Sequence, residues 1–382
     1  MVLYVNIMRA TKFIPTNEPV LDGKEKQYAL DCFKRNWISA GGYYTEQLEK
    51  KFARYEGVEY AVTCSNGTAA IHLALAALGI GPGDEVIIPD FTIICSASMT
   101  ILAGAKPVLV DVDRYWCIDP EKIEEKITSR TKAIMPVHMY GNPANMEPIL
   151  RLAKKHNLYV IEDACAAHGA MVGKHKVGSM GHINCFSFYA SKNMTSGEGG
   201  MVVTNDKKLA ERARMLKSQA FEKPRFIHRM LGFNYRMTDL QSAIGLAQLE
   251  HLPKKVARRR KVAAIYTKLL QGSSDFELPS DPPWGKSTFW MYSLLVKQTF
   301  GRTRDEILDT LPSKGVGCER FYTSMSQQPV FIKGGDARYP DVRGRYPVSH
   351  DIAPRGFYIP SGLGLTLAQQ GYVVKSLLSL KK

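Results

Sequence analysis

The sequence predicts an α/β protein with a mostly parallel sheet flanked by helices and a smaller C-terminal α+β domain. Between residues 84 and 163, apolar segments of about five residues alternate with helical patterns of about 10 to 15 residues, which is typical of parallel strands joined by crossover helices. Beyond residue 272, strand-like and helical segments are mixed and rich in turns. A chain of 382 residues is long enough for a large core and a second, smaller module.

Local sequence patterns predict the helices and strands of the large domain. Residues 1–20 contain Pro15 and Pro19 and are expected to form an extended arm, followed by a large domain over 21–252. Asp22 can cap a first helix that ends near Arg35. Further helices are expected at 45–55, 69–78, 94–103, 120–127, 146–156, 207–216 and 238–249. Strands are expected at 60–64, 85–89, 107–112, 133–137, 158–162 and 201–204.

The small domain is expected over residues 253–382. A long helix after Pro253 should connect it to the large domain. A strand at 290–296 and a helix at 304–311 follow. Residues 323–350 are rich in proline and glycine and are expected to form a loop.

The charge of the chain indicates which classes of partner it can bind. The net charge of +15 favours anionic partners, and nucleotides or phosphorylated substrates fit as well as nucleic acid. The densest basic run, 258–261, has helical spacing and no interleaved aromatic residues, which favours a solvated helix face over a nucleic-acid site. The sequence therefore predicts no nucleic-acid partner.

The cysteines and the apolar runs predict a reduced, cytoplasmic protein. Seven cysteines are scattered without a C-x-x-C pair, which indicates neither a disulfide framework nor a zinc site, and we expect no metal. The N-terminus lacks a basic segment followed by a long apolar one, so no signal peptide is expected. No apolar run approaches about 18 residues, so no membrane span is expected.

The chemistry of the chain centres on Lys192. An apolar, aromatic run over 186–190 ends at this lysine, and a glycine-rich turn leads into the strand at 201–204. A lysine at the end of a strand can be partly desolvated, which lowers its pKa and makes the amine a nucleophile. The same pattern also describes a solvated lysine in a hairpin.

Other candidates lie at the ends of the expected strands, where ligands bind in doubly wound sheets. These candidates are Gly67, Thr68, Phe91, His138 and Asp163. Gly67 and Thr68 begin a helix after a strand and offer N–H groups and a hydroxyl to a phosphate, although a plain helix cap has the same pattern. Asp163 is either a helix cap or a buried anion that holds a cationic partner.

A lysine amine, a phosphate-binding turn and an anchoring carboxylate are together the set that pyridoxal 5′-phosphate requires. The lysine forms the Schiff base, and the aspartate keeps the ring nitrogen protonated so that the ring can accept electrons. Amides and hydroxyls at the strand ends bind the phosphate. The sequence thus predicts an enzyme that uses this cofactor.

Several motifs in the same order also resemble one known family. The chain resembles the sugar-nucleotide aminotransferases of the DegT/DnrJ/EryC1/StrS type, a branch of the fold-type I (aspartate aminotransferase-like) enzymes that use pyridoxal phosphate. The resemblance covers almost the whole chain and rests on segments 66–70, 81–89, 136–141, 161–163, 187–192, 197–201 and 232–237. Segments 37–39 and 136–141 look most like members of the perosamine-synthase type, which aminate C-4 of the sugar.

The resemblance implies roles for individual residues. Lys192 corresponds to the Schiff-base lysine and Asp163 to the partner of the ring nitrogen. Gly67, Thr68 and Ser187 correspond to phosphate ligands. Asn234 matches an asparagine that reaches the phosphate of the neighbouring subunit, which implies a homodimer with shared sites. His138, Arg236 and Trp37 are the candidates for binding the substrate. Arg236, with the basic loop 223–229, would bind its diphosphate, although a solvated surface loop explains Arg236 and this loop equally well. His138 is explained equally well as an imidazole whose hydrogen bonds are satisfied at the end of a strand.

Three positions depart from the family pattern. Ile93 stands where an aromatic residue usually stacks on the cofactor ring, so either an aliphatic contact suffices or Phe91 replaces it. Ala166 stands where glutamine is common. Thr323 and Ser326 stand where relatives often carry histidines that face the sugar nucleotide.

The implied reaction is a ping-pong transamination. An amino group from glutamate would pass through pyridoxamine 5′-phosphate to a nucleotide-linked 4-keto-6-deoxy sugar, of the GDP-perosamine or UDP/dTDP-viosamine type, with Lys192 as the proton carrier. The alternatives are amination at C-3, a sugar dehydratase on the same scaffold, and a regulator without catalysis. The dehydratases have histidine at the position of Lys192, and the intact set of Lys192, Asp163 and Ser187 argues against a regulator.

Overall fold

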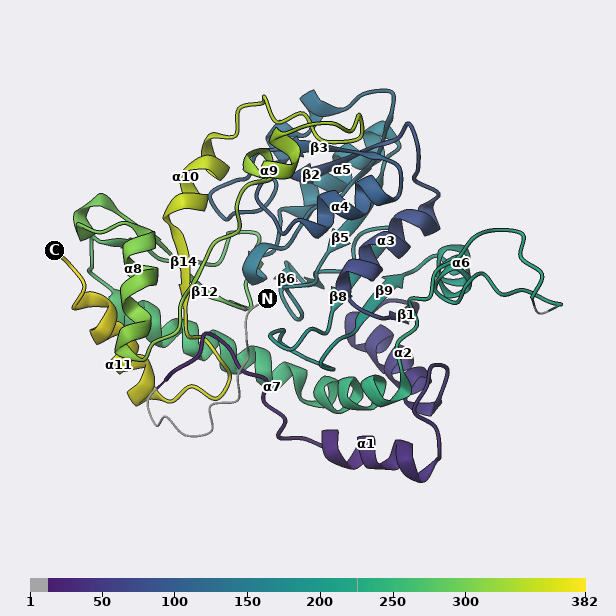
Figure 1. The fold of residues 1–382 in the computed structure, drawn as a ribbon, viewed down its shortest axis with the longest axis horizontal. Helices are drawn as coiled ribbons and strands as arrows, with labels where there is room; N and C mark the ends of the chain where they lie inside the picture. Colours follow the sequence, from purple (N-terminus) through teal and green to yellow (C-terminus); the bar gives the residue numbers. More distant parts are fainter. Residues whose placement is uncertain (1–12, 225) are drawn as a thin grey trace.

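The computed structural model describes residues 13–224 and 226–382, so most of the arm predicted for residues 1–20 lies outside the described residues. A seven-stranded sheet forms the centre of the large domain in this part of the chain (Figure 1). Its order is β1 (Tyr60–Cys64), β9 (Gly200–Thr204), β8 (Ile183–Ser187), β5 (Tyr159–Asp163), β4 (Thr131–Ile134), β2 (Glu85–Pro89) and β3 (Lys106–Val110). Strand β9 runs in the direction opposite to the other six strands, so the predicted mostly parallel sheet is confirmed.

Helices cover both faces of this sheet because successive strand residues point to opposite sides. Val62 and Val202 pack in one core with α3 (Gly67–Leu78), α4 (Cys95–Leu102) and α6 (Lys207–Lys217). Val203 packs on the other face, in a second core with α2 (Tyr43–Glu56) and α7 (Asp239–Leu270). A third core contains α5 (Met146–His156), which packs on β4 and β5.

Two predicted helices differ in the structure. The first, α1 (Glu25–Lys34), begins after Lys24, so Asp22 does not cap it. The helix expected at 120–127 consists of two short 3₁₀ turns, Pro120–Lys122 and Glu124–Lys126. Neither turn buries a residue of its own, and Ile123 between them is the buried position, so this segment has no apolar stripe that could hold a longer helix.

The predicted helices at 238–249 and after Pro253 are one continuous helix, α7, of 32 residues. Proline inside a helix removes one hydrogen bond and crowds the carbonyl four residues earlier. Packing on both sides of Pro253 compensates: Leu249 and Leu252 belong to the core beneath the large sheet, and Val262 and Tyr266 belong to the core of the small domain. The predicted domain boundary at 252 and 253 therefore falls inside α7 (Figure 1).

The small domain contains a four-stranded antiparallel sheet. Its order is β10 (Phe276–Glu277), β12 (Tyr292–Val296), β14 (Gly356–Ile359) and β13 (Glu319–Arg320). It packs with α8 (Arg304–Thr310) and α11 (Leu367–Leu378). A second, three-stranded sheet is formed by β11 (Gly285–Lys286), β6 (Met171–Val172) and β7 (His175–Lys176). No helix in the described residues is long and apolar enough to span a bilayer.

The segment predicted as a loop at 323–350 contains α9 (Pro329–Ile332) and the start of α10 (Pro347–Arg355), and buried carboxylates fasten it to the large domain. Asp90, just after β2, accepts hydrogen bonds from Ser326 N at 2.7 Å and Ser326 Oγ at 3.1 Å. Asp111, just after β3, accepts from Ser349 N at 2.9 Å and Ser349 Oγ at 2.8 Å. Ser326 also contacts His350 Nε2 at 2.8 Å. The side chain of Ser326 therefore faces the large domain.

Candidate active site

A cavity of about 870 Å³ is lined by residues of both domains. Its large-domain side contains the start of α3, with Gly67 and Thr68, and the end of β8 with the loop that carries Lys192. Its small-domain side contains Trp290 and residues of β13 and β14. The cavity thus lies at the carboxyl ends of parallel strands, as expected for a doubly wound sheet.

Lys192 lines this cavity, and burial lowers the pKa of its amine. The neighbouring Cys165 and Asp163 oppose part of that shift. The Nζ atom lies 3.7 Å from the centre of the Trp290 ring, within the range of a cation–π contact. Because its pKa is lowered, a larger fraction of this amine is unprotonated, and therefore nucleophilic, than in a solvated lysine.

Asp163 is a buried carboxylate at the end of β5. It is 2% exposed, and its Oδ1 accepts a hydrogen bond from Cys165 N at 3.1 Å. Its Oδ2 receives a long contact of 3.5 Å from Ser96 Oγ. The residues that follow it form turns, so Asp163 does not cap a helix. Of the two sequence-based interpretations, the structure supports the buried anion.

The start of α3 forms an anion-binding corner with Ser187. Asn66 caps the helix by accepting a hydrogen bond from Ala69 N at 2.8 Å, and the N–H groups of Gly67 and Thr68 precede the first intrahelical hydrogen bonds. A Cβ atom added to Gly67 would lie 2.6 Å from Ser187 Cβ, so only glycine permits this close approach. Two backbone donors, a hydroxyl and the positive end of a helix meet at one point, which suits a phosphate.

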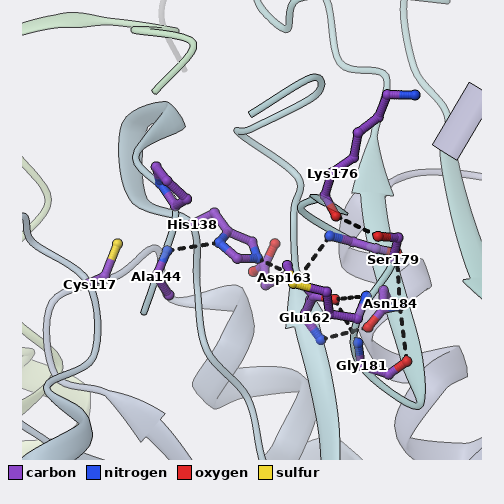
Figure 2. Close-up of polar contacts among 12 residues, drawn as sticks. Cys117, His138, Ala144, Glu162, Asp163, Lys176, Ser179, Gly181 and Asn184 are labelled. Carbon is purple, nitrogen blue, oxygen red and sulfur yellow. Dashed lines mark hydrogen bonds and ion pairs between the residues drawn. The ribbon is translucent and has the colours of Figure 1, made fainter. Parts of the chain in front are cut away.

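His138 has a structural role in this geometry, so of the two interpretations of this residue the structure supports the satisfied imidazole and not the substrate ligand. Figure 2 shows its ring between Ala144 and Glu162. Nδ1 accepts a hydrogen bond from Ala144 N at 3.0 Å, and Nε2 lies 3.0 Å from Glu162 Oε2. The side chain is 0% exposed and does not line the cavity, so neither ring nitrogen is available to a ligand.

Glu162 anchors the turn that follows β7. Its carboxylate is 0% exposed and accepts hydrogen bonds from the N–H groups of Gly178, Met180 and Gly181 at 2.7 to 2.8 Å, in addition to the contact with His138 (Figure 2). His138 also donates its backbone N–H to the carbonyl oxygen of Asp163 at 3.0 Å. This network therefore supports the strand end that carries Asp163.

Of the two alternatives for the ring contact, Ile93 and not Phe91 lines the cavity. Phe91 is 0% exposed and packs against Tyr140 and Phe321, with ring centres 6.2 and 5.5 Å away. It does not line the cavity, whereas Ile93 does and is 43% exposed. An aliphatic side chain is therefore the one available to the face of a bound ring.

Asn234, Arg236 and Trp37 do not line this cavity either. Arg236 Nε donates to Asn234 Oδ1 at 2.9 Å, and Asn234 is exposed. Arg236 borders a different hollow, beside Ala40 and Gly41. Trp37 is 48% exposed in the loop between α1 and α2. Within one described chain, these three residues are not brought together with Lys192.

Two residues near Lys192 carry no signal in the sequence. Trp290 precedes β12, and its Nε1–H donates to the carbonyl of Ser191 at 2.6 Å. Asn17, from the predicted arm, donates its side-chain amide to the same carbonyl and lines the cavity. Both contacts join segments far apart in the chain, and the local pattern around either residue does not indicate them.

The residues present fit pyridoxal 5′-phosphate. The set contains an amine of lowered pKa on Lys192, a buried carboxylate on Asp163 and a glycine-permitted anion corner at Gly67 and Ser187. When bound, the cofactor supplies an electron sink that stabilises a carbanion.

Comparisons with known proteins agree with this chemistry. The model of the DegT/DnrJ/EryC1/StrS aminotransferase family matches residues 19–378. The chain is 42% identical over 364 residues to the GDP-perosamine synthase of Caulobacter vibrioides, covering 94% of this chain and 96% of the relative. It is 39% identical over 316 residues to a UDP-N-acetyl-3-dehydro-alpha-D-glucosamine 3-aminotransferase of Acidithiobacillus ferrooxidans, covering 82% of each.

A solved structure shares the fold. The crystal structure of DesV from S. venezuelae, in complex with a ketimine intermediate, superposes with a TM-score of 0.88 and is 31% identical, covering 97% of this chain and 98% of that one. The chain therefore belongs to the DegT/DnrJ/EryC1/StrS aminotransferase family, and pyridoxal 5′-phosphate is its cofactor.

Proposed function

We propose that the protein transfers the amino group of L-glutamate to C-4 of a 4-keto-6-deoxy sugar linked to a nucleoside diphosphate. The similarity to GDP-perosamine synthase over 94% of the chain carries the choice of C-4. GDP-4-keto-6-deoxymannose is the first candidate acceptor, followed by UDP- and dTDP-linked 4-keto-6-deoxyglucose. We also propose a cytoplasmic location, which the seven cysteines without disulfide partners support.

The described residues divide the chemistry among them. Lys192 would bind the cofactor covalently and then, once released, carry a proton between the substrate carbon and the cofactor. Asp163 would hold the proton on the cofactor's ring nitrogen, which maintains the electron sink. The N–H groups of Gly67 and Thr68, with Ser187 Oγ, would fix the phosphate and so keep the reacting carbon near Lys192.

We further propose a homodimer in which the partner completes each site. Among the described residues that line the cavity, Lys192 is the single cation, beside the acidic Glu198 and Glu319. Binding a nucleoside diphosphate needs several cationic or N–H donors. Arg229 and Arg236 belong to a basic segment outside this cavity, and in Figure 1 the loop after α6 extends away from the body of the chain. The described residues 221–224 and 226–237 are therefore our candidate for reaching the partner's cavity, with Asn234 at the phosphate.

A comparison of matched ketones tests the function. The purified enzyme would be given glutamate with nucleotide-linked 4-keto-6-deoxy and 3-keto sugars, and the aminated products would be identified by NMR. We expect turnover of the 4-keto sugar to exceed that of the 3-keto sugar at least tenfold. Moving the ketone by one carbon displaces the reacting atom by about one to two bond lengths, which disrupts a near-attack geometry.

The relative that aminates at C-3 supplies the competing candidate. Faster turnover of the 3-keto sugar, with a 3-amino product, would replace our assignment by that activity. Loss of the C-3 hydroxyl without gain of nitrogen would instead indicate a dehydratase.

A further inference from the structure

The small-domain wall of the cavity carries a carboxylate that the proposed transamination does not use. Glu319 on β13 and Tyr358 on β14 are direct cross-strand partners, and both line the cavity. Cross-strand partners project from the same face of a sheet, so a carboxylate and a phenol lie side by side. Arg320 and Phe357, the next pair, alternate to the opposite face, where Phe357 is 0% exposed.

The carboxylate of Glu319 has acceptor capacity to spare. Its residue is exposed, and its Oε1 receives a contact of 3.2 Å from the adjacent Arg320 N. No ion pair involves it among the residues that the structure describes. A carboxylate has about four acceptor positions, so most remain open toward the cavity.

Tyr322 extends the same wall and is held rigidly. Its backbone N–H donates to the hydroxyl of Tyr140 at 3.2 Å, and the two rings stack with centres 5.3 Å apart. Burial raises the pKa of Tyr322 well above its ordinary value, so the phenol stays neutral and can donate or accept. The wall therefore offers the phenol of Tyr322 and the carboxylate of Glu319 on a fixed backbone.

The negative charge of Glu319 determines which part of a substrate can lie against this wall of the cavity. Both carboxylates of glutamate and both phosphates of a nucleotide sugar would be repelled by Glu319 at contact distance. Of the uncharged parts of the nucleotide sugar, the hexose is the one whose ketone must lie beside Lys192 in this same cavity, and its hydroxyls are donors that a carboxylate accepts in pairs.

We propose that Glu319, which lies beside Tyr358, accepts hydrogen bonds from the ring hydroxyls of the acceptor sugar and so determines which sugar the enzyme accepts. The proposal rests on the proposed function and deepens it. A hydrogen bond to a charged group that is lost with Glu319 corresponds to at least a tenfold loss of selectivity for a hydroxylated sugar.

Measuring the two half-reactions separately distinguishes a role of Glu319 in sugar binding from a role in glutamate binding, cofactor binding or folding. The amination of the cofactor by glutamate and its return reaction with the keto sugar would each be followed in single turnovers through the cofactor's absorbance. In Glu319→Gln and Glu319→Ala, we expect the sugar half-reaction to lose at least tenfold in its apparent second-order rate constant. The glutamate half-reaction should stay within twofold, which also shows that the variants are folded and loaded.

Two controls define the outcome. Arg320→Gln lies on the same strand but faces the other way, and both of its half-reactions should match the wild type. Of two acceptors that lack the C-2 or the C-3 hydroxyl, one should react equally with wild type and Glu319→Gln, because the hydroxyl that Glu319 binds is then absent. A sugar half-reaction unchanged in Glu319→Gln, or a glutamate half-reaction accelerated in it, overturns the proposal. A wild type that aminates none of the keto sugars rejects the proposed function and, with it, this inference.

Discussion

Substituting alanine for Gly67 tests the phosphate corner at the start of α3. The new Cβ would lie 2.6 Å from Ser187 Cβ and 3.1 Å from Cys165 Sγ. Two carbon atoms normally approach to about 3.5 to 4.0 Å, so the overlap is about 1 Å. Because the Ser187 Cβ atom is attached directly to the backbone, rotation of a side chain cannot relieve it, and overpacking of this kind costs about 1 to 3 kcal/mol.

The same displacement should weaken cofactor binding. Moving α3 away from Ser187 separates the N–H donors from the hydroxyl, and losing one hydrogen bond to a charged phosphate costs about 1.5 to 3 kcal/mol. The dissociation constant of pyridoxal phosphate should therefore rise by about 10-fold to 150-fold.

Equilibrium binding to the apoprotein, followed by absorbance, measures this change, and urea unfolding measures the stability. Gly364→Ala is the matched control, because a Cβ there meets nothing within 4 Å. If Gly67→Ala bound the cofactor within twofold of the wild type, the phosphate would not lie at this corner.

The other predictions concern Lys192 and the second subunit. Borohydride reduction should fix the cofactor on Lys192, as mapped by mass spectrometry, and Lys192→Ala should form no such adduct; a label on another lysine would contradict the assignment. Because burial lowers the pKa of Lys192, its deprotonated fraction at neutral pH exceeds that of a solvated lysine, so reconstitution with the cofactor should reach its maximal rate at a lower pH than the reaction of an exposed lysine. Mixing inactive Lys192→Ala with inactive Asn234→Ala subunits should restore part of the activity, since one of the two hybrid sites is then intact; subunit exchange without recovery would exclude sharing in trans.

The sequence predicted the strands and the strand-end residues well for one physical reason. Buried parallel strands appear as continuous apolar runs, and ligands bind where such runs end. Gly67, Ser187 and Lys192 satisfy that rule and line one cavity. His138 satisfies it too, yet its ring points into the network around Glu162, because position along a strand does not determine what lies beside the side chain.

Contacts between distant segments could not be predicted. Trp290 and Ser191 are separated by 99 residues, and Asn17 and Ser191 by 174. Similarly, Pro253 looked like the end of one helix, whereas packing against two cores carries α7 through it. Asn234, Arg236 and Trp37 do not line the cavity of the described chain, so their place in the fold did not follow from the sequence pattern either.

The continuity of α7 constrains how the cavity can respond to a ligand. One 32-residue helix contributes side chains to the core beneath Lys192 and to the core beneath the wall that carries Glu319. The two sides of the cavity are therefore connected by one continuous helix, and a rotation of one domain toward the other would require α7 to bend. Bending is least costly at Pro253, where a hydrogen bond is already missing. A substrate that contacts both sides should meet an enzyme whose shape is set before it arrives, so that little of its binding free energy is consumed by domain closure.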